Sequence, residues 1–249
     1  MSRSSILHGS VLHLAQDRAL ALLVSPGEAG ANCIFVAFDA DGRMPIRSMA
    51  MQKLIIEVRM NEYATRSGNP NVPWTPQEIT EDALACREAG ASSVHFHCRT
   101  AEGRPDHSFE SYREVVSGLR AKSDLLLHPT LGADENDGSP AKRLSYVTRL
   151  AEQGLAVDLA PMDMGSTNVD FFDSDTGEFT TVDKVYINTT ATLIEFAKTF
   201  REMGMKPCLA TWNVGMLQLA QAFVRKGLVD APPFLALSLG GDQTLPLHP

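Results

Sequence analysis

The chain has 249 residues, of which 44% are apolar and 21% charged, and its formal net charge is −8. This length and apolar fraction provide a sizeable core for one large domain or two modest ones. An acidic chain without a basic run argues against nucleic-acid binding, and every apolar run is shorter than a membrane span requires.

The cysteines and the N-terminal stretch indicate the cellular compartment. The four cysteines are far apart and form no CxxC pair: Cys33, Cys86, Cys98 and Cys208. That pattern is typical of reduced thiols rather than of a disulfide framework or a cysteine zinc site. The stretch ILHGSVLHLAQDRALALLV is not a secretion signal, because polar and charged residues interrupt it between His8 and Arg18. We therefore expect a cytoplasmic protein.

From Lys53 onward, short aliphatic runs alternate with longer segments of helical period. The runs predict six strands, at residues 53–60, 93–97, 124–130, 155–161, 207–212 and 234–239. The first predicted helix has the clearest boundary signals. Thr75 is the N-cap, Pro76 lies in the first turn, Glu78 completes a capping box and Gly90 ends the helix.

Apolar side chains at helical spacing predict four further helices. The second helix is marked by Phe109 to Leu119, and the third opens at Ser139 and Pro140. The fourth ends near Gly204 and the fifth at Gly227.

Repeated βα units with short connections predict a parallel sheet covered by helices, either a doubly wound sheet or a (β/α)8 barrel of the TIM type. No GxGxxG follows the first strand, and no GxxxxGK[ST] occurs in the chain. The missing nucleotide signatures favour the barrel, assigned to residues 51–249.

Two regions depart from simple alternation. Residues 161–188 form a long connection with a predicted hairpin that turns at Asp175–Gly177, a length typical of lids and binding loops. Residues 1–50 precede the first regular strand, although CIFVAF at 33–38 could be a strand. The simplest expectation for residues 1–50 is an extension outside the barrel, and the alternative is that these residues complete the barrel.

The second predicted strand carries the clearest chemical signal, SVHFHCR. Side chains alternate along a strand, so His95, His97 and Arg99 share one face, while Val94, Phe96 and Cys98 pack under helices. Two imidazoles on one face can share a metal ion. The alternative is a pair of hydrogen-bonded core histidines.

Further polar candidates lie at the ends of the other strands, where barrel enzymes carry their catalytic groups. Each of them could instead be a helix cap or a turn former. They are Asn61, Glu62, Thr130, Asp163 and Asn213. His128 lies one layer deeper than Thr130 and is expected to be a buried, hydrogen-bonded histidine.

Several motifs together make the chain resemble the β-keto acid cleavage enzyme family. They are NPNVPWTPQEITEDALACREAGASSVHFHCR, GRPDHSFESYREVV, LLLHPTLGA, APMDMGSTNVD and WNVGML with KGLVDAPPF, between about Lys53 and Leu239. The resemblance implies a zinc-bearing (β/α)8 barrel. It also implies a reaction in which a β-keto acid and acetyl-CoA give acetoacetate and a new acyl-CoA, and it implies a homo-oligomer.

The resemblance also implies roles for single residues. His95 and His97 match the two histidine zinc ligands, and Thr130 matches a hydroxyl position that serves substrate binding and catalysis. Glu62 matches the acidic residue after the first strand. Arg99 is expected to hold a neighbouring ligand or to orient the substrate carboxylate.

Other positions depart from the family. Asp163 falls where an asparagine is expected, and both it and Asn213 are candidate substrate-binding residues. Ala210 replaces a glutamate on the fifth strand. The chain ends just after the sixth strand, so the last two βα units, which carry a further zinc ligand, are not visible.

These departures leave alternatives to an active acyl-exchange enzyme. One is a truncated, non-catalytic family member that binds a small acid or a partner chain. Another is a zinc-dependent hydrolase or aldolase on the same barrel.

Overall fold

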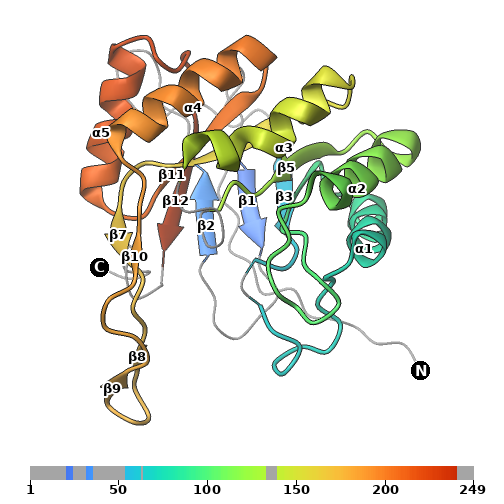
Figure 1. The fold of residues 1–249 in the computed structure, drawn as a ribbon, viewed down its shortest axis with the longest axis horizontal. Helices are drawn as coiled ribbons and strands as arrows, with labels where there is room; N and C mark the ends of the chain where they lie inside the picture. Colours follow the sequence, from blue (N-terminus) through green and yellow to red (C-terminus); the bar gives the residue numbers. More distant parts are fainter. Residues whose placement is uncertain (1–20, 25–31, 36–53, 63, 133–138, 240–249) are drawn as a thin grey trace.

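The structure, a computed structural model, describes residues 21–24, 32–35, 54–62, 64–132 and 139–239, with the first two segments described as backbone only. The fold is mixed α/β (Figure 1). Eight strands form one sheet in the order β5-β4-β3-β1-β2-β12-β11-β6. Their bounds are β1 (Ala21–Val24), β2 (Asn32–Phe35), β3 (Ile55–Arg59), β4 (Ser93–Phe96), β5 (Leu126–Pro129), β6 (Leu159–Asp163), β11 (Lys206–Thr211) and β12 (Phe234–Leu239).

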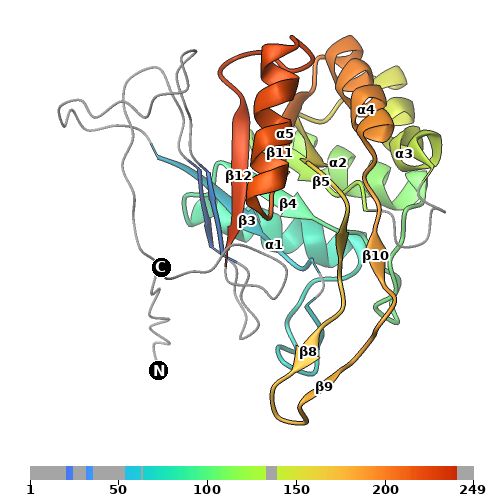
Figure 2. The same cartoon turned by 90° about the vertical axis from the view of Figure 1, so that its left-hand side faces the viewer.

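Five helices of the described chain pack against one face of this sheet, as Figures 1 and 2 show. They are α1 (Pro76–Glu88), α2 (Phe109–Lys122), α3 (Pro140–Glu152), α4 (Thr190–Met203) and α5 (Val214–Arg225). The main hydrophobic core lies between the two layers and includes Val94 and Phe96 of β4, Val116 of α2 and Phe196 of α4.

The predicted helix boundaries are confirmed where the sequence carries explicit caps. In α1, Thr75 accepts a hydrogen bond from the backbone N–H of Glu78, and the Glu78 carboxylate accepts one from the N–H of Thr75. Pro76 is the first helical residue. The end of α4 is set by Gly204, whose φ of 70° lies in the left-handed region that glycine adopts without strain.

The fourth predicted strand is displaced in the structure. The strand β6 begins at Leu159 and includes Asp163, whereas residues 155–161 were expected. Asp158 explains the difference, because its carboxylate accepts the backbone N–H of Leu127 at 2.8 Å in place of a strand carbonyl. The N–H of Asp158 donates to the carbonyl of Leu127 at 3.2 Å, which links β5 and β6, the first and last strands of the order.

Two segments of the N-terminal region belong to the sheet. The strand β1 runs parallel to β3, and β2 runs antiparallel to both β1 and β12. The expectation that residues 1–50 lie outside the sheet is therefore wrong for residues 21–24 and 32–35. The possible strand at 33–38 is confirmed in part by β2, and the rest of residues 1–50 lies outside the described residues.

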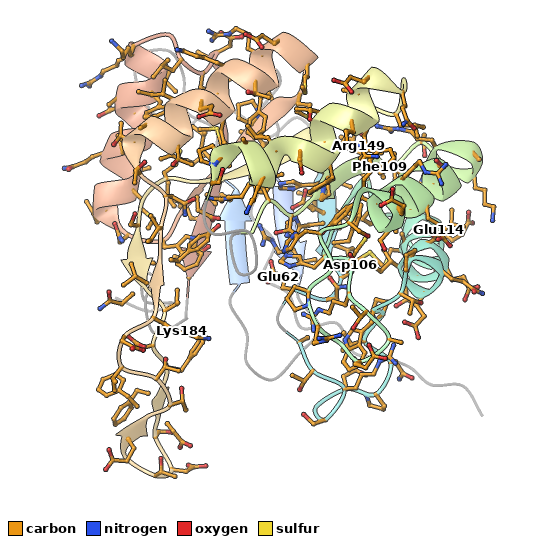
Figure 3. All side chains as sticks on the ribbon, in the orientation of Figure 1. Glu62, Asp106, Phe109, Glu114, Arg149 and Lys184 are labelled. Atoms are coloured by element: carbon orange, nitrogen blue, oxygen red, sulfur yellow. The ribbon has the colours of Figure 1, made fainter. Side chains whose placement is uncertain are left out.

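The long connection after β6 forms an arm that projects beyond the body of the protein (Figures 1 and 2). It contains β7 (Thr167–Asn168), β8 (Phe172–Asp173), β9 (Glu178–Phe179) and β10 (Val185–Tyr186), paired as β7 with β10 and β8 with β9. The predicted hairpin turn is confirmed, with Gly177 at φ 75°. In Figure 3 Lys184 lies on this arm, while Glu62 lies nearer the centre of the molecule.

The other face of the sheet carries the buried side chains of Glu57, His95 and His128. Its apolar part is a small cluster of Cys208, Ala210 and Ala236, packed against Ile55 and Phe234. Cys86 and Cys98 are free thiols in the described chain. No described helix is long and apolar enough to cross a membrane.

Candidate active site

A row of three charged or ionisable residues crosses neighbouring strands. Arg59 of β3 pairs in register with His95 of β4, which pairs with His128 of β5. Val94, Phe96 and Cys98 lie in the main core under the helices. The predicted alternation along this strand is therefore confirmed, and His95 occupies the face away from the helices.

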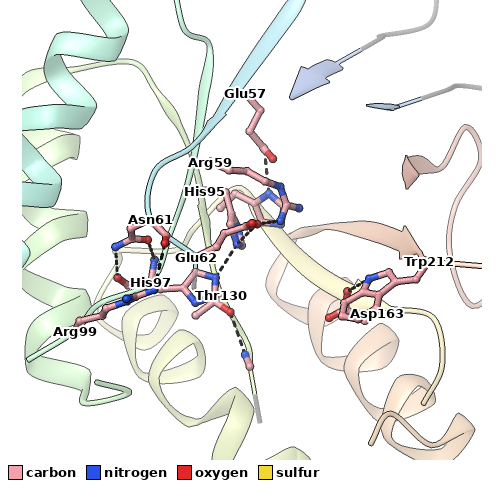
Figure 4. A network of polar contacts seen from close by, with 12 residues as sticks. Glu57, Arg59, Asn61, Glu62, His95, His97, Arg99, Thr130, Asp163 and Trp212 are labelled. Carbon is pink, nitrogen blue, oxygen red and sulfur yellow. Dashed lines mark hydrogen bonds and ion pairs between the residues drawn. The ribbon is translucent and has the colours of Figure 1, made fainter. Parts of the chain in front are cut away.

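His95 and His97 bring their rings together at the end of β4. Their Nε2 atoms are 3.1 Å apart, and the ring planes are inclined by 79° (Figure 4). Two nitrogens bound to one tetrahedral zinc ion lie about 3.3 Å apart. The pair therefore has a spacing that suits two ligands of a single ion, although one ring nitrogen can also donate a hydrogen bond to the other.

The surroundings keep both imidazoles neutral. Burial lowers the pKa of His95 well below its usual value, and the positive charge of Arg59 lowers it further. Burial also lowers the pKa of His97, with Arg99 and Arg59 adding to the effect. A neutral imidazole has a free lone pair, which is the form that binds a metal ion.

Glu62 is the described acid nearest to the imidazole pair. Its Oε1 lies 4.0 Å from Nε2 of His95 and forms an ion pair with Arg59. The backbone φ of Glu62 is 26°, a value that non-glycine residues rarely adopt and that costs free energy. Strain of this kind occurs at functional positions, and the role of Glu62 as a site residue stays a prediction.

Asn61 and Arg99 fix the segment that carries Glu62. The side chain of Asn61 donates to the carbonyl of His97 at 2.7 Å and accepts the N–H of the same residue at 2.9 Å. The guanidinium of Arg99 donates to the carbonyls of Ala64 and Asn61 at 2.8 and 3.2 Å. Both side chains thus tie the loop after β3 to the end of β4.

Below the imidazole pair, Glu57 and His128 form a contact. The sequence predicted one of its two partners, His128. Nδ1 of His128 lies 3.0 Å from Oε2 of Glu57, and both side chains are fully buried. The expectation that His128 is a buried, hydrogen-bonded histidine is confirmed. Glu57 and Arg59 were missed, although charged residues two apart in IIEVR follow the same alternation as His95 and His97.

Thr130 follows β5 on the same face and is 5% exposed. Its hydroxyl accepts the backbone N–H of Gly132 at 3.1 Å, and its carbonyl accepts a hydrogen bond from Tyr146. These contacts fix the backbone at Thr130 beside the histidine strand. Its expected role in substrate binding stays a prediction.

Asp163 and Asn213 lie apart from the imidazole pair. Asp163 accepts hydrogen bonds from the Tyr186 hydroxyl at 2.8 Å and from Nε1 of Trp212 at 3.1 Å (Figure 4). Asn213 is the N-cap of α5 and accepts the N–H of Met216 at 3.0 Å. Asn213 therefore acts as a helix cap, the alternative role given for it above. Substrate binding by Asp163 or Asn213 stays a prediction.

The side chains near the imidazole pair provide some of the ligands that a zinc ion needs. His95 and His97 supply two neutral nitrogens at a suitable spacing, and Glu62 supplies a nearby carboxylate. Within the described residues, however, no group of three His, Cys, Asp or Glu side chains is arranged to hold a metal ion. A catalytic zinc ion normally has three protein ligands, so the pair alone accounts for two of them.

The chain is similar to known enzymes over most of its length. It is 29% identical to the 3-keto-5-aminohexanoate cleavage enzyme of Fusobacterium nucleatum subsp. nucleatum over 192 residues, which are 76% of this chain and 64% of that enzyme. It is 29% identical to the 3-dehydrocarnitine:acetyl-CoA trimethylamine transferase of Rhizobium meliloti, over 71% of this chain and 60% of the relative. The chain therefore spans less than two thirds of the length of these relatives.

Solved structures add a similarity of fold. The ternary complex of ObcA with C4-CoA adduct and oxalate superposes with a TM-score of 0.54 at 19% identity, covering 67% of this chain and 37% of ObcA. The family model of the beta-keto acid cleavage enzymes matches residues 53–249. The chain therefore belongs to the β-keto acid cleavage enzyme family.

Proposed function

We propose that this chain is a zinc-dependent β-keto acid cleavage enzyme that exchanges an acyl group between a β-keto acid and acetyl-CoA. The observation that carries the proposal is the pair of imidazoles of His95 and His97, whose Nε2 atoms are 3.1 Å apart in a member of this family. The pair lies at the carboxyl ends of parallel strands, where enzymes with such sheets carry their reactive groups.

The proposal includes a barrel-type arrangement of the sheet. The strands β3, β4, β5, β6, β11 and β12 follow one another with helices between them, and β1 and β2 fill the gap between β12 and β3. The contact of Asp158 with Leu127 joins the remaining two strands, β5 and β6. Eight strands in this cyclic order correspond to a (β/α)8 barrel in which an N-terminal hairpin supplies the last two positions.

The proposed reaction breaks one carbon–carbon bond and forms another. The bond between C2 and C3 of the β-keto acid and the thioester bond of acetyl-CoA break. The CH2–carboxylate fragment bonds to the acetyl group as acetoacetate, and the remaining acyl group bonds to the sulfur of CoA. Zinc bound by His95 and His97 would supply a Lewis acid that stabilises negative charge on the keto and carboxylate oxygens. Names of relatives that include acetyl-CoA, such as 3-oxoadipate:acetyl-CoA acetyltransferase, support the choice of co-substrate.

The other site residues have distinct roles in this proposal. The Glu62 carboxylate, held by Arg59, accepts and returns a proton close to the imidazole pair. Arg99 positions Glu62 through the backbone of residues 61–64 rather than by contact with the substrate. The Thr130 hydroxyl donates a hydrogen bond to a substrate oxygen while it accepts one from Gly132.

The experiment is an assay of purified protein with acetyl-CoA and a panel of β-keto acids, in which acetoacetate and the new acyl-CoA are measured. We expect both products in equal amounts, and we expect His95→Ala to abolish them while leaving the protein folded. The exposed Glu114→Ala on α2 serves as a control away from the pair. Cleavage that needs no CoA would favour a hydrolase or an aldolase, and inert protein would favour a non-catalytic family member.

A further inference from the structure

Arg59 is a cation that lies among the candidate site residues. It ends β3, pairs in register with His95 of β4, and its side chain is 13% exposed. Burial lowers the pKa of His95, and the positive charge of Arg59 is the next cause. Arg59 also lowers the pKa of His97, after burial and Arg99. The guanidinium of Arg59 therefore provides a positive charge beside both imidazoles.

Two carboxylates lie near this guanidinium, and they are held in different ways. Glu57, two residues earlier on the same face of β3, is fully buried and contacts Nδ1 of His128 at 3.0 Å. Glu62 is 27% exposed, and its Oε1 forms the ion pair with Arg59. Within the described residues, the other contact of this carboxylate is the approach of Oε1 to Nε2 of His95 at 4.0 Å. Glu62 is therefore the carboxylate that a ligand can replace.

The backbone of Glu62 is fixed by its neighbours, so its side chain can leave Arg59 without moving the loop (Figure 4). Asn61 bonds to the carbonyl and to the N–H of His97 at 2.7 and 2.9 Å. Arg99 donates to the carbonyl of Asn61 at 3.2 Å. A rotation of the Glu62 side chain alone would then open the guanidinium to a ligand at the carboxyl end of the sheet.

The electrostatics of the site favour the exchange of one carboxylate for another. An arginine stays protonated, and a largely buried guanidinium that loses its anionic partner is strongly destabilised. A planar carboxylate matches the fork of N–H donors, and such charge-assisted hydrogen bonds are stronger than those between neutral groups. A ligand carboxylate in the place of Glu62 keeps the charge beside the imidazoles balanced, whereas a neutral ligand does not compensate for the lost ion pair.

We propose that Arg59 binds the carboxylate of the β-keto acid, and that the Glu62 carboxylate occupies this position when no substrate is bound. This inference rests on the proposed function and adds to it a binding residue and a competing internal anion. Substrate binding releases Glu62 close to the imidazole pair, where its Oε1 already lies 4.0 Å from Nε2 of His95. Arg59 thus provides affinity for a carboxylate and Glu62 reduces it, so the two residues have opposite effects on one equilibrium.

The test compares acetoacetate with its methyl ester, two probes that differ in one negative charge. Calorimetric titration without acetyl-CoA measures the dissociation constant of each probe. We expect the unmodified chain to bind acetoacetate at least about tenfold more tightly than the ester, the effect of one charge-assisted hydrogen bond. Arg59→Gln should abolish this preference. Arg59→Lys, which retains the charge but not the planar fork, should keep a part of it.

Glu62→Gln gives the sharper result, because it removes the competing anion and retains the shape of the side chain. We expect this variant to bind acetoacetate about three- to tenfold more tightly than the unmodified chain does. Its binding of the methyl ester should change by less than about twofold. This gain in affinity keeps the inference testable even where Arg59→Gln fails to fold.

The matched control is the exposed ion pair between Arg87 of α1 and Asp124. Asp124→Asn removes the carboxylate partner of an arginine outside the site, as Glu62→Gln does within it. We expect Asp124→Asn to change the binding of neither probe. Circular dichroism of each variant verifies that the fold is unchanged.

The titration distinguishes this inference from the proposed function, because it requires no turnover. Tighter acetoacetate binding by Glu62→Gln, with the preference lost in Arg59→Gln, would support the inference even in a protein that forms no acyl-CoA. A preference that survives in Arg59→Gln, or weaker or unchanged acetoacetate binding by Glu62→Gln, would overturn it even in an active enzyme.

A chelator separates Arg59 from a metal ion as the group that binds the carboxylate. The titrations of the unmodified chain and of Glu62→Gln are repeated after dialysis against the chelator. We expect the gain in acetoacetate affinity to persist, because the arginine does not depend on a metal. A gain that disappears would overturn the inference, since the carboxylate would then bind to the metal ion rather than to Arg59.

Discussion

Glu57 and His128 form a fully buried contact that spans β4, with Oε2 of Glu57 and Nδ1 of His128 3.0 Å apart. The Ser93 hydroxyl donates to the same carboxylate oxygen at 2.9 Å. Burial alone would raise the pKa of Glu57, but His128 and Arg59 hold it below its usual value, so the carboxylate stays ionised. The ring of His128 packs edge-on against the ring of His95, with the ring centroids 4.7 Å apart. The contact between Glu57 and His128 therefore lies directly beneath the imidazole pair.

We expect Glu57→Ala to lower the free energy of unfolding by about 3–5 kcal/mol, because it removes one partner of a buried pair and leaves the other without compensation. Glu57→Gln, which retains a hydrogen-bonding group of the same shape, should cost less. Urea unfolding measures both. The exposed Glu114→Ala on α2 is the control and should change stability by no more than about 0.5 kcal/mol. An unchanged stability of Glu57→Ala would show that the pair does not stabilise the fold.

The N-terminal strands lead to a second prediction. Without β1 and β2, the edges of β3 and β12 would lose their neighbours in the sheet. Exposed strand edges promote association between chains. We therefore expect a chain without residues 1–50 to aggregate, which size-exclusion chromatography with light scattering would detect.

A point variant tests the pairing of β2 with its neighbouring strands without a deletion. Ile34 of β2 pairs with Leu22 on one side and with Leu237 on the other. Ile34→Pro removes a backbone donor from the interior of the sheet and should lower the thermal midpoint clearly. A soluble monomer from the shortened chain, with the melting behaviour of the full chain, would contradict this role for β1 and β2.

Features set by neighbouring residues were predictable from the sequence. The capping box of α1 depends only on Thr75 and Glu78, and the common face of His95 and His97 follows from the alternation of a strand. The turn at Gly177 depends on a local backbone conformation. Each of these signals lies within a few residues of the feature that it specifies.

Features that depend on distant pairing could not be predicted in the same way. The start of β6 is set by Asp158, whose carboxylate replaces a strand acceptor for Leu127, 31 residues earlier. The aromatic donors to Asp163 are 23 and 49 residues away. The positions of β1 and β2 next to β3 and β12 likewise follow from packing of the whole sheet.

The proposed zinc site gives a third prediction, measured without turnover. Elemental analysis should find about one zinc ion per chain, and His95→Ala and His97→Ala should each reduce the zinc content severely. The absorption spectrum of the cobalt-loaded protein should lose its metal-ligand bands in both variants. The exposed Glu114→Ala on α2 should retain the metal. Full zinc content in both single variants would show that the metal is bound elsewhere.

The capping box of α1 gives a prediction on pH. Burial would raise the pKa of Glu78, but hydrogen bonds from the N–H groups of Thr75 and Trp74 and from Arg66 lower it to about 2. A carboxylate with a lowered pKa in the folded state stabilises the protein above its ordinary pKa of about 4.5, and this contribution is lost as the pH falls from there towards 2. The side chain is 40% exposed, so solvent screening limits the contribution to about 1 kcal/mol, the size of one helix cap.

We therefore expect Glu78→Gln to be less stable than the unmodified chain at pH 6 and the difference to shrink as the pH approaches 2. Urea unfolding at a series of pH values measures it. Glu195→Gln, an exposed change within α4, is the control because that side chain caps no helix end. A stability difference that stays constant between pH 6 and pH 2 would mean that Glu78 acts through its shape, since the charge disappears over this range while the side-chain volume does not.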